Sequence, residues 1–126
     1  MTATLGYVSN WQVGQWMAEL VAGESYASLH FSDPGAVPDN PSATEVNGAS
    51  YLRAPVYWKV SGARVLVSTN VQEWRGLPET TLTHVAVFTG AYSGQMRAVI
   101  PRPDPLYVIN NGSFRLEAGD LYLRWP

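Results

Sequence analysis

The first apolar pattern along the chain predicts one amphipathic helix near the N-terminus. Apolar residues recur at intervals of three and four positions, which places on one helical face Val13, Trp16, Met17, Leu20 and Val21. Ser9 and Gln12 have the spacing of a capping box that would begin the helix. Val8 is placed to pack on Val13 as a hydrophobic staple, and Gly23 can end the helix. Because so short a helix is marginal alone in water, we expect it to pack on a sheet edge or on a neighbouring chain.

After the helix the pattern changes to short apolar runs that are separated by turn residues roughly every 8–12 positions, which is typical of a β-sandwich or barrel. Alternation is clearest around Val85 and Val87, which we expect to be buried. The sequence therefore predicts an all-β, antiparallel β-sandwich or jelly-roll-like domain at residues 26–126. Residues 1–25 would form an N-terminal arm and helix within a single domain overall. The expected strands are 26–31, 54–60, 64–69, 82–89, 95–100, 106–109, 113–117 and 121–125.

Turn residues and prolines refine this pattern. Asn111-Gly112 is the strongest hairpin signal, because a type I′ turn favours positive φ at both central residues. Pro101, Pro103 and Pro105 lack the N–H groups that a central strand needs, so this stretch should be a stiff connector or an edge strand. Residues 36–49 are polar and show little periodicity, so we expect them to form the long loop of the fold.

The composition indicates that the surface of the protein is unusual. Only 14% of the residues are charged, against roughly 25% in typical soluble domains. Five Trp and seven Tyr accompany these few charges, a composition found at the buried centres of protein interfaces, although an aromatic sandwich core is the alternative. The residues we expect at such an interface are Trp11, Trp16, Trp58, Trp74, Arg75 and Trp125.

Charge and apolar content also limit the kinds of partner that the protein can have. The net charge is −2, and the basic side chains are scattered from Arg53 to Arg124 without a cluster, which argues against nucleic-acid binding. The chain has no Cys, which excludes disulfides and thiolate metal ligands. No apolar run approaches the roughly 18–20 residues that span a membrane, so we expect a protein made and used in soluble form.

Candidate catalytic and metal sites are weak. His30 and His84 lie on separate predicted strands and could meet, but a metal site needs a further ligand, and only Asp33 or Glu45 could supply one. Asp33 and Glu45 could also form a glycosidase-like carboxylate pair, whose separation a sequence does not set. Gly-x-Ser-x-Gly, Walker and Gly-x-Gly-x-x-Gly patterns are absent. We therefore expect no enzymatic activity, no metal and no cofactor.

Aromatic side chains could instead form a platform for sugar rings. Trp58, Trp74 and Trp125 are the candidates, with Trp74-Arg75 at a strand end the first pair to consider. The alternative for each Trp is burial in the core or at a subunit contact.

The residues before and after the long loop predict a structural loop clamp. Asp33 can accept backbone N–H bonds in its own turn, and Gly35 relieves the strain there. Glu45 is spaced to reach Arg53 if the loop folds back between strands. This set of four residues is expected to hold the fold rather than to perform chemistry.

Four motifs in order resemble a pattern of small tail-fibre or decoration-like virion proteins of actinobacterial, mycobacteriophage-type phages. They are residues 29–35 (Leu-His-Phe-Ser-Asp-Pro-Gly), residues 45–53 (Glu-Val-Asn-Gly-Ala-Ser-Tyr-Leu-Arg), residues 83–88 (Thr-His-Val-Ala-Val-Phe) and Gly119-Asp120. The resemblance covers residues 26–126. It implies a β-sandwich in a multi-copy virion component, without catalytic residues.

Together, these observations predict a phage virion structural protein that acts through protein contacts, as a minor tail or tail-tip component. A capsid decoration or head-fibre protein is the alternative, and a carbohydrate-binding receptor-recognition module is an alternative of another class. The expected partners are copies of the chain in a trimer or other ring, other virion proteins and, for the second class, a host surface glycan. The expected location is the virion, assembled in the host cytoplasm.

Overall fold

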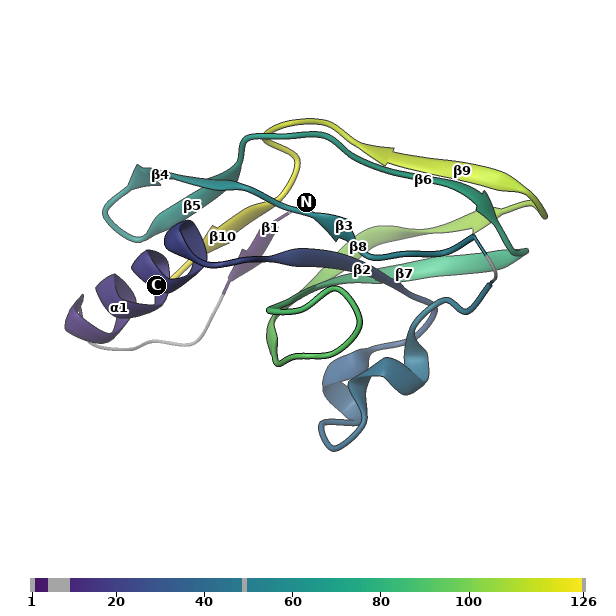
Figure 1. Cartoon of the computed structure of the whole chain (residues 1–126), viewed down its shortest axis with the longest axis horizontal. Coiled ribbons are helices and arrows are strands. Elements are labelled where there is room, and N and C mark those ends of the chain that lie inside the picture. The colour runs from purple at the N-terminus through teal and green to yellow at the C-terminus, as the bar shows by residue number, and fades with distance from the viewer. Residues whose placement is uncertain (1, 5–9, 49, 126) are drawn as a thin grey trace.

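The computed structural model describes residues 2–4, 10–48 and 50–125, with side chains from residue 13 onward. One helix and a set of strands are arranged in two layers (Figure 1). In chain order the elements are β1 (Thr2–Thr4), α1 (Asn10–Ala22), β2 (Tyr26–His30), η1 (Pro34–Ala36), η2 (Pro41–Thr44), β3 (Ala54–Pro55), β4 (Trp58–Gly62), β5 (Val65–Ser68), β6 (Gln72–Leu77), β7 (Thr80–Phe88), β8 (Met96–Val108), β9 (Gly112–Leu116) and β10 (Tyr122–Arg124).

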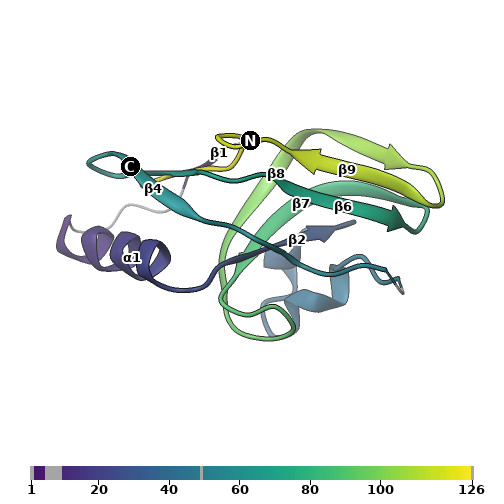
Figure 2. The same ribbon diagram turned by 45° about the horizontal axis from the view of Figure 1, so that its top comes forward.

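Two sheets and a ribbon make up the layers. One sheet has the order β1-β10-β5-β4, the other has the order β3-β2-β7-β8, and β6 pairs with β9 in a two-stranded ribbon. The ribbon extends the first sheet, because β5 leads into β6 and β9 leads into β10, and both views show it lying over β7 and β8 (Figures 1 and 2). Strand pairs are antiparallel except for β1 with β10. The predicted all-β, sandwich-like architecture is confirmed.

The core lies between the layers and is built from the inward faces of the strands. In β7, Val85 and Val87 are fully buried, as predicted, and they pair with Leu29 and Ala27 of β2. Paired residues of an antiparallel sheet share a face, so these four side chains form one apolar patch directed into the sandwich. Leu66, Leu77, Ile100 and Leu123 from other strands join the same cluster.

Helix α1 closes one end of this core. Val13, Met17 and Leu20 are buried in the same cluster as the sheet residues, which explains how so short a helix is stabilised. Val21 was expected on the apolar face but is 45% exposed. Gly23 follows the helix with its N–H bonded to the carbonyl of Glu19, where a β-carbon would come within 2.8 Å of that oxygen. The predicted capping box at Ser9 and the staple at Val8 lie outside the described residues.

Three strand predictions need correction. β6 was not predicted, because its inward positions are Gln72 and Trp74, so a polar residue occupies a core position and hides the alternation. The expected run 54–60 is divided into β3 and β4, which belong to different sheets. The expected strands 95–100 and 106–109 belong to the single edge strand β8, and residues 102–105 bulge out opposite Thr83. The prolines therefore occupy an edge, one of the two predicted alternatives.

The predicted Asn111-Gly112 hairpin is also wrong. β9 pairs with β6 instead of with β8, so this turn carries the chain from one layer to the other. Asn111 adopts a φ of 65°, whereas Gly112 has no positive φ, which rules out a type I′ turn. The N–H of Asn111 donates to the carbonyl of Leu77 at 2.7 Å and ties the turn to the end of β6.

Candidate functional site

The candidate site lies at the β3-β2-β7-β8 sheet, where a long loop pairs with the end of β2. This loop runs through η1 and η2, which lie together at one side of the sheet in Figure 1. Its residues after η2 pair with the end of β2: the N–H of Phe31 donates to Thr44, and the N–H of Val46 donates to Leu29. The polar loop therefore makes sheet-like hydrogen bonds with β2. It also supplies Thr44, which contacts the ring of the fully buried His30.

The structure brings Glu45 and Arg53 together in a bidentate ion pair. The Arg53 Nε donates to Oε2 of Glu45 and its Nη2 donates to Oε1, each at 2.9 Å. The two side chains are only 5% and 10% exposed for Arg53 and Glu45. Charges that are taken out of water need such directed bonds to offset the desolvation cost.

Arg53 also reaches two further segments. Its Nη1 donates to the carbonyls of Gly90 and Ser93, each at 3.0 Å, so it holds the loop between β7 and β8. The guanidinium lies over the Phe88 ring, 3.9 Å from its centroid, in a cation–π contact. One side chain thus connects the long loop, strand β7 and the 90–94 loop.

Tyr51 extends the network to β2. Its hydroxyl donates to Oε2 of Glu45 at 2.6 Å and accepts from the N–H of Leu29 at 3.0 Å. Burial and, after it, the hydrogen bond and charge of Glu45 raise the pKa of Tyr51 above its ordinary value. A side-chain hydroxyl therefore takes the place of a strand partner at Leu29.

His30 is held between two hydroxyls. Its Nε2 lies 2.7 Å from Oγ of Ser28, its Nδ1 lies 2.8 Å from Oγ1 of Thr44, and its ring stacks on Phe88 at 6.3 Å between centroids. Burial lowers the pKa of His30 to about 4, so the ring is neutral near pH 7. His84 lies opposite His30 in the register of β2 and β7. Its hydrogen bond is with the hydroxyl of Thr83. The described residues contain no group of three side chains suited to hold a metal ion.

Asp33 and Gly35 form a separate capping turn. The Oδ1 of Asp33 accepts from the N–H of Gly35 at 2.8 Å and caps η1. The carboxylate of Glu45 is already engaged by Arg53 and Tyr51. Asp33 and Glu45 therefore do not share the arrangement of a free acid and a free base that glycoside hydrolysis would use.

A groove of about 560 Å³ opens above this network. Its floor includes Glu45, Tyr51 and Arg53. The apolar lining residues Phe31, Leu52 and Tyr92 are 48%, 61% and 84% exposed, so they form a solvent-facing apolar rim. Chemically, the groove presents apolar surface above polar groups whose hydrogen bonds are satisfied internally, which suits binding of another molecule better than catalysis.

The structure corrects the expected role of three tryptophans. Trp58, Trp74 and Trp125 are only 6%, 3% and 2% exposed, so they belong to the core of this chain rather than to a sugar platform or an interface. Trp16 is half-buried at the surface of α1, while the side chain of Trp11 lies outside the described part of the structure. The alternative of an aromatic core therefore holds for the three buried rings.

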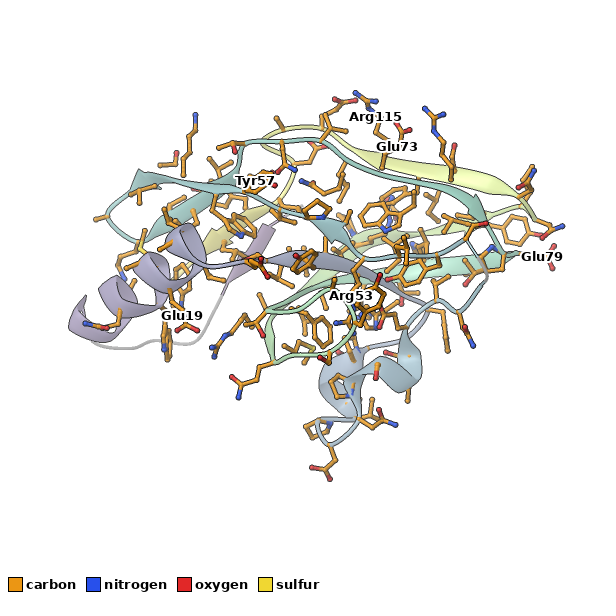
Figure 3. All side chains as sticks on the ribbon, viewed as in Figure 1. Glu19, Arg53, Tyr57, Glu73, Glu79 and Arg115 are labelled. Atoms are coloured by element: carbon orange, nitrogen blue, oxygen red, sulfur yellow. The ribbon has the colours of Figure 1, made fainter. Side chains whose placement is uncertain are left out.

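Arg75 lies on the outer face of the ribbon, with its side chain 82% exposed and paired with Glu73. Arg115 of β9 also contacts Glu73, at 2.9 Å, and contacts Glu117 at 2.7 Å. Figure 3 shows Glu73 and Arg115 at the edge of the molecule, whereas the side chain of Arg53 is only 5% exposed. Two chemically similar Arg–Glu pairs thus differ completely in burial.

Sequence reasoning missed Tyr51, Phe88 and Tyr92 as parts of this site. A signal existed for Tyr51, because it lies between Glu45 and Arg53 in the motif of residues 45–53. The stacking of Arg53 on Phe88 depends on strands that are distant in sequence, which no local pattern reveals.

Comparison with protein-family models matches residues 17–124 to the family described as podophage GP4 fiber I protein gp80. No curated protein matches the chain significantly. In the described part of the chain, no helix is long and apolar enough to cross a membrane.

Proposed function

We propose, from the premise that this chain belongs to the family of the podophage GP4 fiber I protein gp80, that it is a repeated structural subunit of a phage tail fibre or tail tip. Family membership makes the chain a virion component of the phage fibre class. The family is named for a podophage protein and does not support the actinobacterial or mycobacteriophage-type assignment suggested by the sequence motifs. The finer placement at the tail and the repetition of copies are parts of the proposal.

The observation that carries this proposal is the family match over residues 17–124. The clamp supports it, because Arg53 directs its bonds to Glu45, Gly90 and Ser93 of its own chain. Such a network makes a loop rigid, and a rigid loop can present a surface without the ordering cost of a mobile one. We therefore assign the clamp a positioning role: it holds the rim of the groove for contacts with other virion proteins.

Labelling of intact virions tests the proposal. An antibody fragment raised against the folded domain is added to virions of the phage that encodes the chain, and its position is determined by electron microscopy. Label at the tail is the expected result. Label on the capsid would overturn the tail placement in favour of decoration or a head fibre, and absence of the chain from purified virions by mass spectrometry would overturn the virion role.

The groove favours one function of another class, recognition of a host surface glycan. Aromatic side chains beside polar groups suit sugar rings, and Phe31 and Tyr92 flank a floor that contains Glu45 and Arg53. This second proposal predicts that a host polysaccharide binds the chain in isothermal titration and that Phe31→Ala weakens the binding by at least tenfold. A matched Tyr107→Ala variant, which alters an exposed tyrosine outside the groove, should leave glycan binding unchanged.

A further inference from the structure

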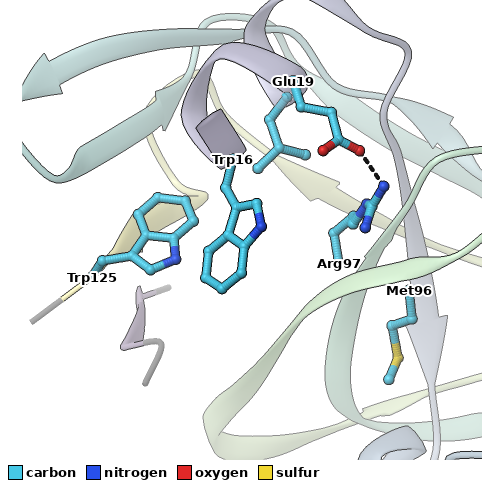
Figure 4. A pocket seen from close by; sticks show the side chains of 6 residues that line it. Trp16, Glu19, Met96, Arg97 and Trp125 are labelled. Atoms are coloured by element: carbon cyan, nitrogen blue, oxygen red, sulfur yellow. Dashed lines mark hydrogen bonds and ion pairs between the residues drawn. The ribbon is translucent and has the colours of Figure 1, made fainter. Parts of the chain in front are cut away.

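The charged groups that line two of the hollows in this chain are already paired. In the pocket between α1 and the start of β8, the carboxylate of Glu19 contacts Arg97 (Figure 4). In the groove, the carboxylate of Glu45 is held by Arg53. These four side chains therefore supply no free acid or base, and a reaction at either place would need groups of another kind.

Two asparagine-glycine pairs give the chain a reactivity that needs no acidic or basic side chain. They are Asn47-Gly48 and Asn111-Gly112. In such a pair the backbone nitrogen of the glycine can attack the side-chain carbonyl carbon of the asparagine. A C–N bond forms, and the glycine N–H proton leaves with the side-chain NH₂ group as ammonia. Water then opens the resulting succinimide ring at one of its two carbonyls, which leaves aspartate or isoaspartate. Glycine favours the attack, because it has no β-carbon to obstruct the approach.

The two pairs have similar surroundings. Gly48 and Asn111 line the same pocket of about 420 Å³, together with Gly76 and Pro78. Asn47 and Asn111 are both exposed, and the glycine that follows each of them is half-buried. The local sequence and the access to water are therefore matched. A difference in reactivity between the two pairs has to come from how the backbone is held.

The backbone of Asn111-Gly112 is held by its neighbours. The N–H of Gly112 donates to the carbonyl of Ile109 at 2.9 Å, and the N–H of Asn111 donates to the carbonyl of Leu77 at 2.7 Å. Gly112 also lies opposite Leu77 in the register of β6 and β9. A β-carbon on Gly112 would come within 2.9 Å of Val108 Cγ1, so the chain is closely packed there. Attack on Asn111 would therefore break the bond to Ile109 and turn the peptide away from β6.

The backbone of Asn47-Gly48 is held much less. The pair lies in the long loop, outside the helices and strands. Among the described residues, neither the side chain of Asn47 nor the N–H of Gly48 forms a hydrogen bond. The carbonyl of Gly48 accepts from the N–H of Tyr51 at 3.1 Å, which closes a turn but leaves the nitrogen of Gly48 free. The ring of Pro78 stands 3.0 Å from where a β-carbon of Gly48 would be, an apolar contact that binds no N–H.

We propose that Asn47 is a site of spontaneous deamidation in the folded chain, whereas the turn protects Asn111. The succinimide forms between the nitrogen of Gly48 and Cγ of Asn47, and the hydrolysed product carries one more negative charge than the encoded chain. Asn47 lines the groove together with Glu45, so this charge is added to the surface that the groove presents. The modification is a property of the folded chain and does not depend on the proposed fibre function.

Peptide mapping by mass spectrometry tests the proposal on the purified, folded chain after incubation at mildly alkaline pH. Each of the two hydrogen bonds at Asn111-Gly112 should lower the population that is open to attack by roughly twofold to tenfold. Asn47 should therefore be modified about tenfold faster than Asn111. Equal rates in the folded chain, or faster modification of Asn111, overturn the proposal.

The chain unfolded in guanidinium chloride is the control for this comparison. Both pairs then have a free backbone and the same reacting groups, so their rates should become similar. If Asn47 still reacted about tenfold faster after unfolding, the difference would come from the neighbouring sequence, and the structural explanation would be overturned.

Matched variants give a second readout, because each deamidation adds one negative charge that ion-exchange chromatography detects. The unaltered chain should acquire an acidic form during incubation. Asn47→Gln should acquire it about tenfold more slowly, since the longer side chain would have to close a less favourable six-membered ring and only Asn111 would remain reactive. Asn111→Gly should acquire it at the rate of the unaltered chain. Unchanged formation of the acidic form in Asn47→Gln overturns the assignment to Asn47.

Discussion

The guanidinium carbon of Arg53 lies 3.9 Å from the centre of the Phe88 ring, and the same guanidinium forms two hydrogen bonds to Glu45. This relationship fixes the long loop against β7, although the loop is polar and has little regular structure of its own. The opposite edge of the guanidinium holds Gly90 and Ser93. The rigidity of the groove and of the Tyr92 loop thus depends on one buried cation.

Removal of this cation should be strongly destabilising. In Arg53→Ala, Glu45 would be left buried without its partner, so we expect the free energy of unfolding to fall by about 3–5 kcal/mol. Urea denaturation followed by circular dichroism measures the change. Arg75→Ala is the control, because the 82% exposed side chain of Arg75 forms a surface pair worth about 1 kcal/mol or less. Similar losses in both variants would contradict the clamp.

The hydroxyl of Tyr51 should contribute separately. Tyr51→Phe leaves the N–H of Leu29 without its side-chain acceptor and removes a bond to Glu45, so we expect a loss of about 1–3 kcal/mol. Hydrogen exchange should show faster exchange of the Leu29 amide in particular. Tyr107→Phe is the control, since the Tyr107 hydroxyl contacts Glu79 at the exposed surface. Unchanged exchange at Leu29 would show that water replaces the hydroxyl.

The local part of this fold could be predicted from the sequence. The helix face of Val13, Met17 and Leu20 and the buried pair Val85 and Val87 have strong periodicity, and they lie in the core. The Glu45 and Arg53 pair could also be named, because the motif places both residues at the ends of one loop segment. These features depend on short-range spacing, which a sequence displays directly.

The long-range part could not be predicted. The partner of β9 is β6, and two strands, β7 and β8, lie between them in the chain. The Asn111-Gly112 turn signal carries no information about that choice. Composition likewise did not show on which side of the sheets the rings of Trp58, Trp74 and Trp125 lie. In each case the outcome depends on which strands pair, and that is decided by packing of the whole core.

Acid should destabilise the protein through His30. Burial lowers its pKa from 6.5 to about 4, so between these values the unfolded chain binds a proton that the folded chain does not. The stability is therefore fully present above about pH 6.5 and is lost as the pH falls toward 4. The total loss is on the order of 3 kcal/mol. Urea denaturation at several pH values measures it.

A variant separates this effect from the titration of carboxylates over the same range. His30→Gln keeps groups that can bond Ser28 and Thr44 but does not titrate, so its stability should fall less between pH 6.5 and 4 than that of the unaltered chain. His84→Gln, which alters the histidine paired with His30 across β2 and β7, should retain most of the dependence on pH, because burial is the largest cause of the lowered pKa of His30. Identical pH profiles for the unaltered chain and His30→Gln would refute the assignment.

The turn at Asn111 should tolerate Gly better than Ala, because its φ of 65° is the left-handed region. A β-carbon there costs roughly 1–2 kcal/mol, which Asn reduces by local hydrogen bonding. Asn111→Ala should therefore lower the free energy of unfolding by about 1 kcal/mol, whereas Asn111→Gly should change it by less than about 0.5 kcal/mol. Asn110→Ala is the matched control, since Asn110 has no positive φ. If Asn111→Gly and Asn111→Ala were equally destabilising in urea denaturation, the side-chain amide of Asn111 rather than its backbone conformation would hold β9 in register with β6.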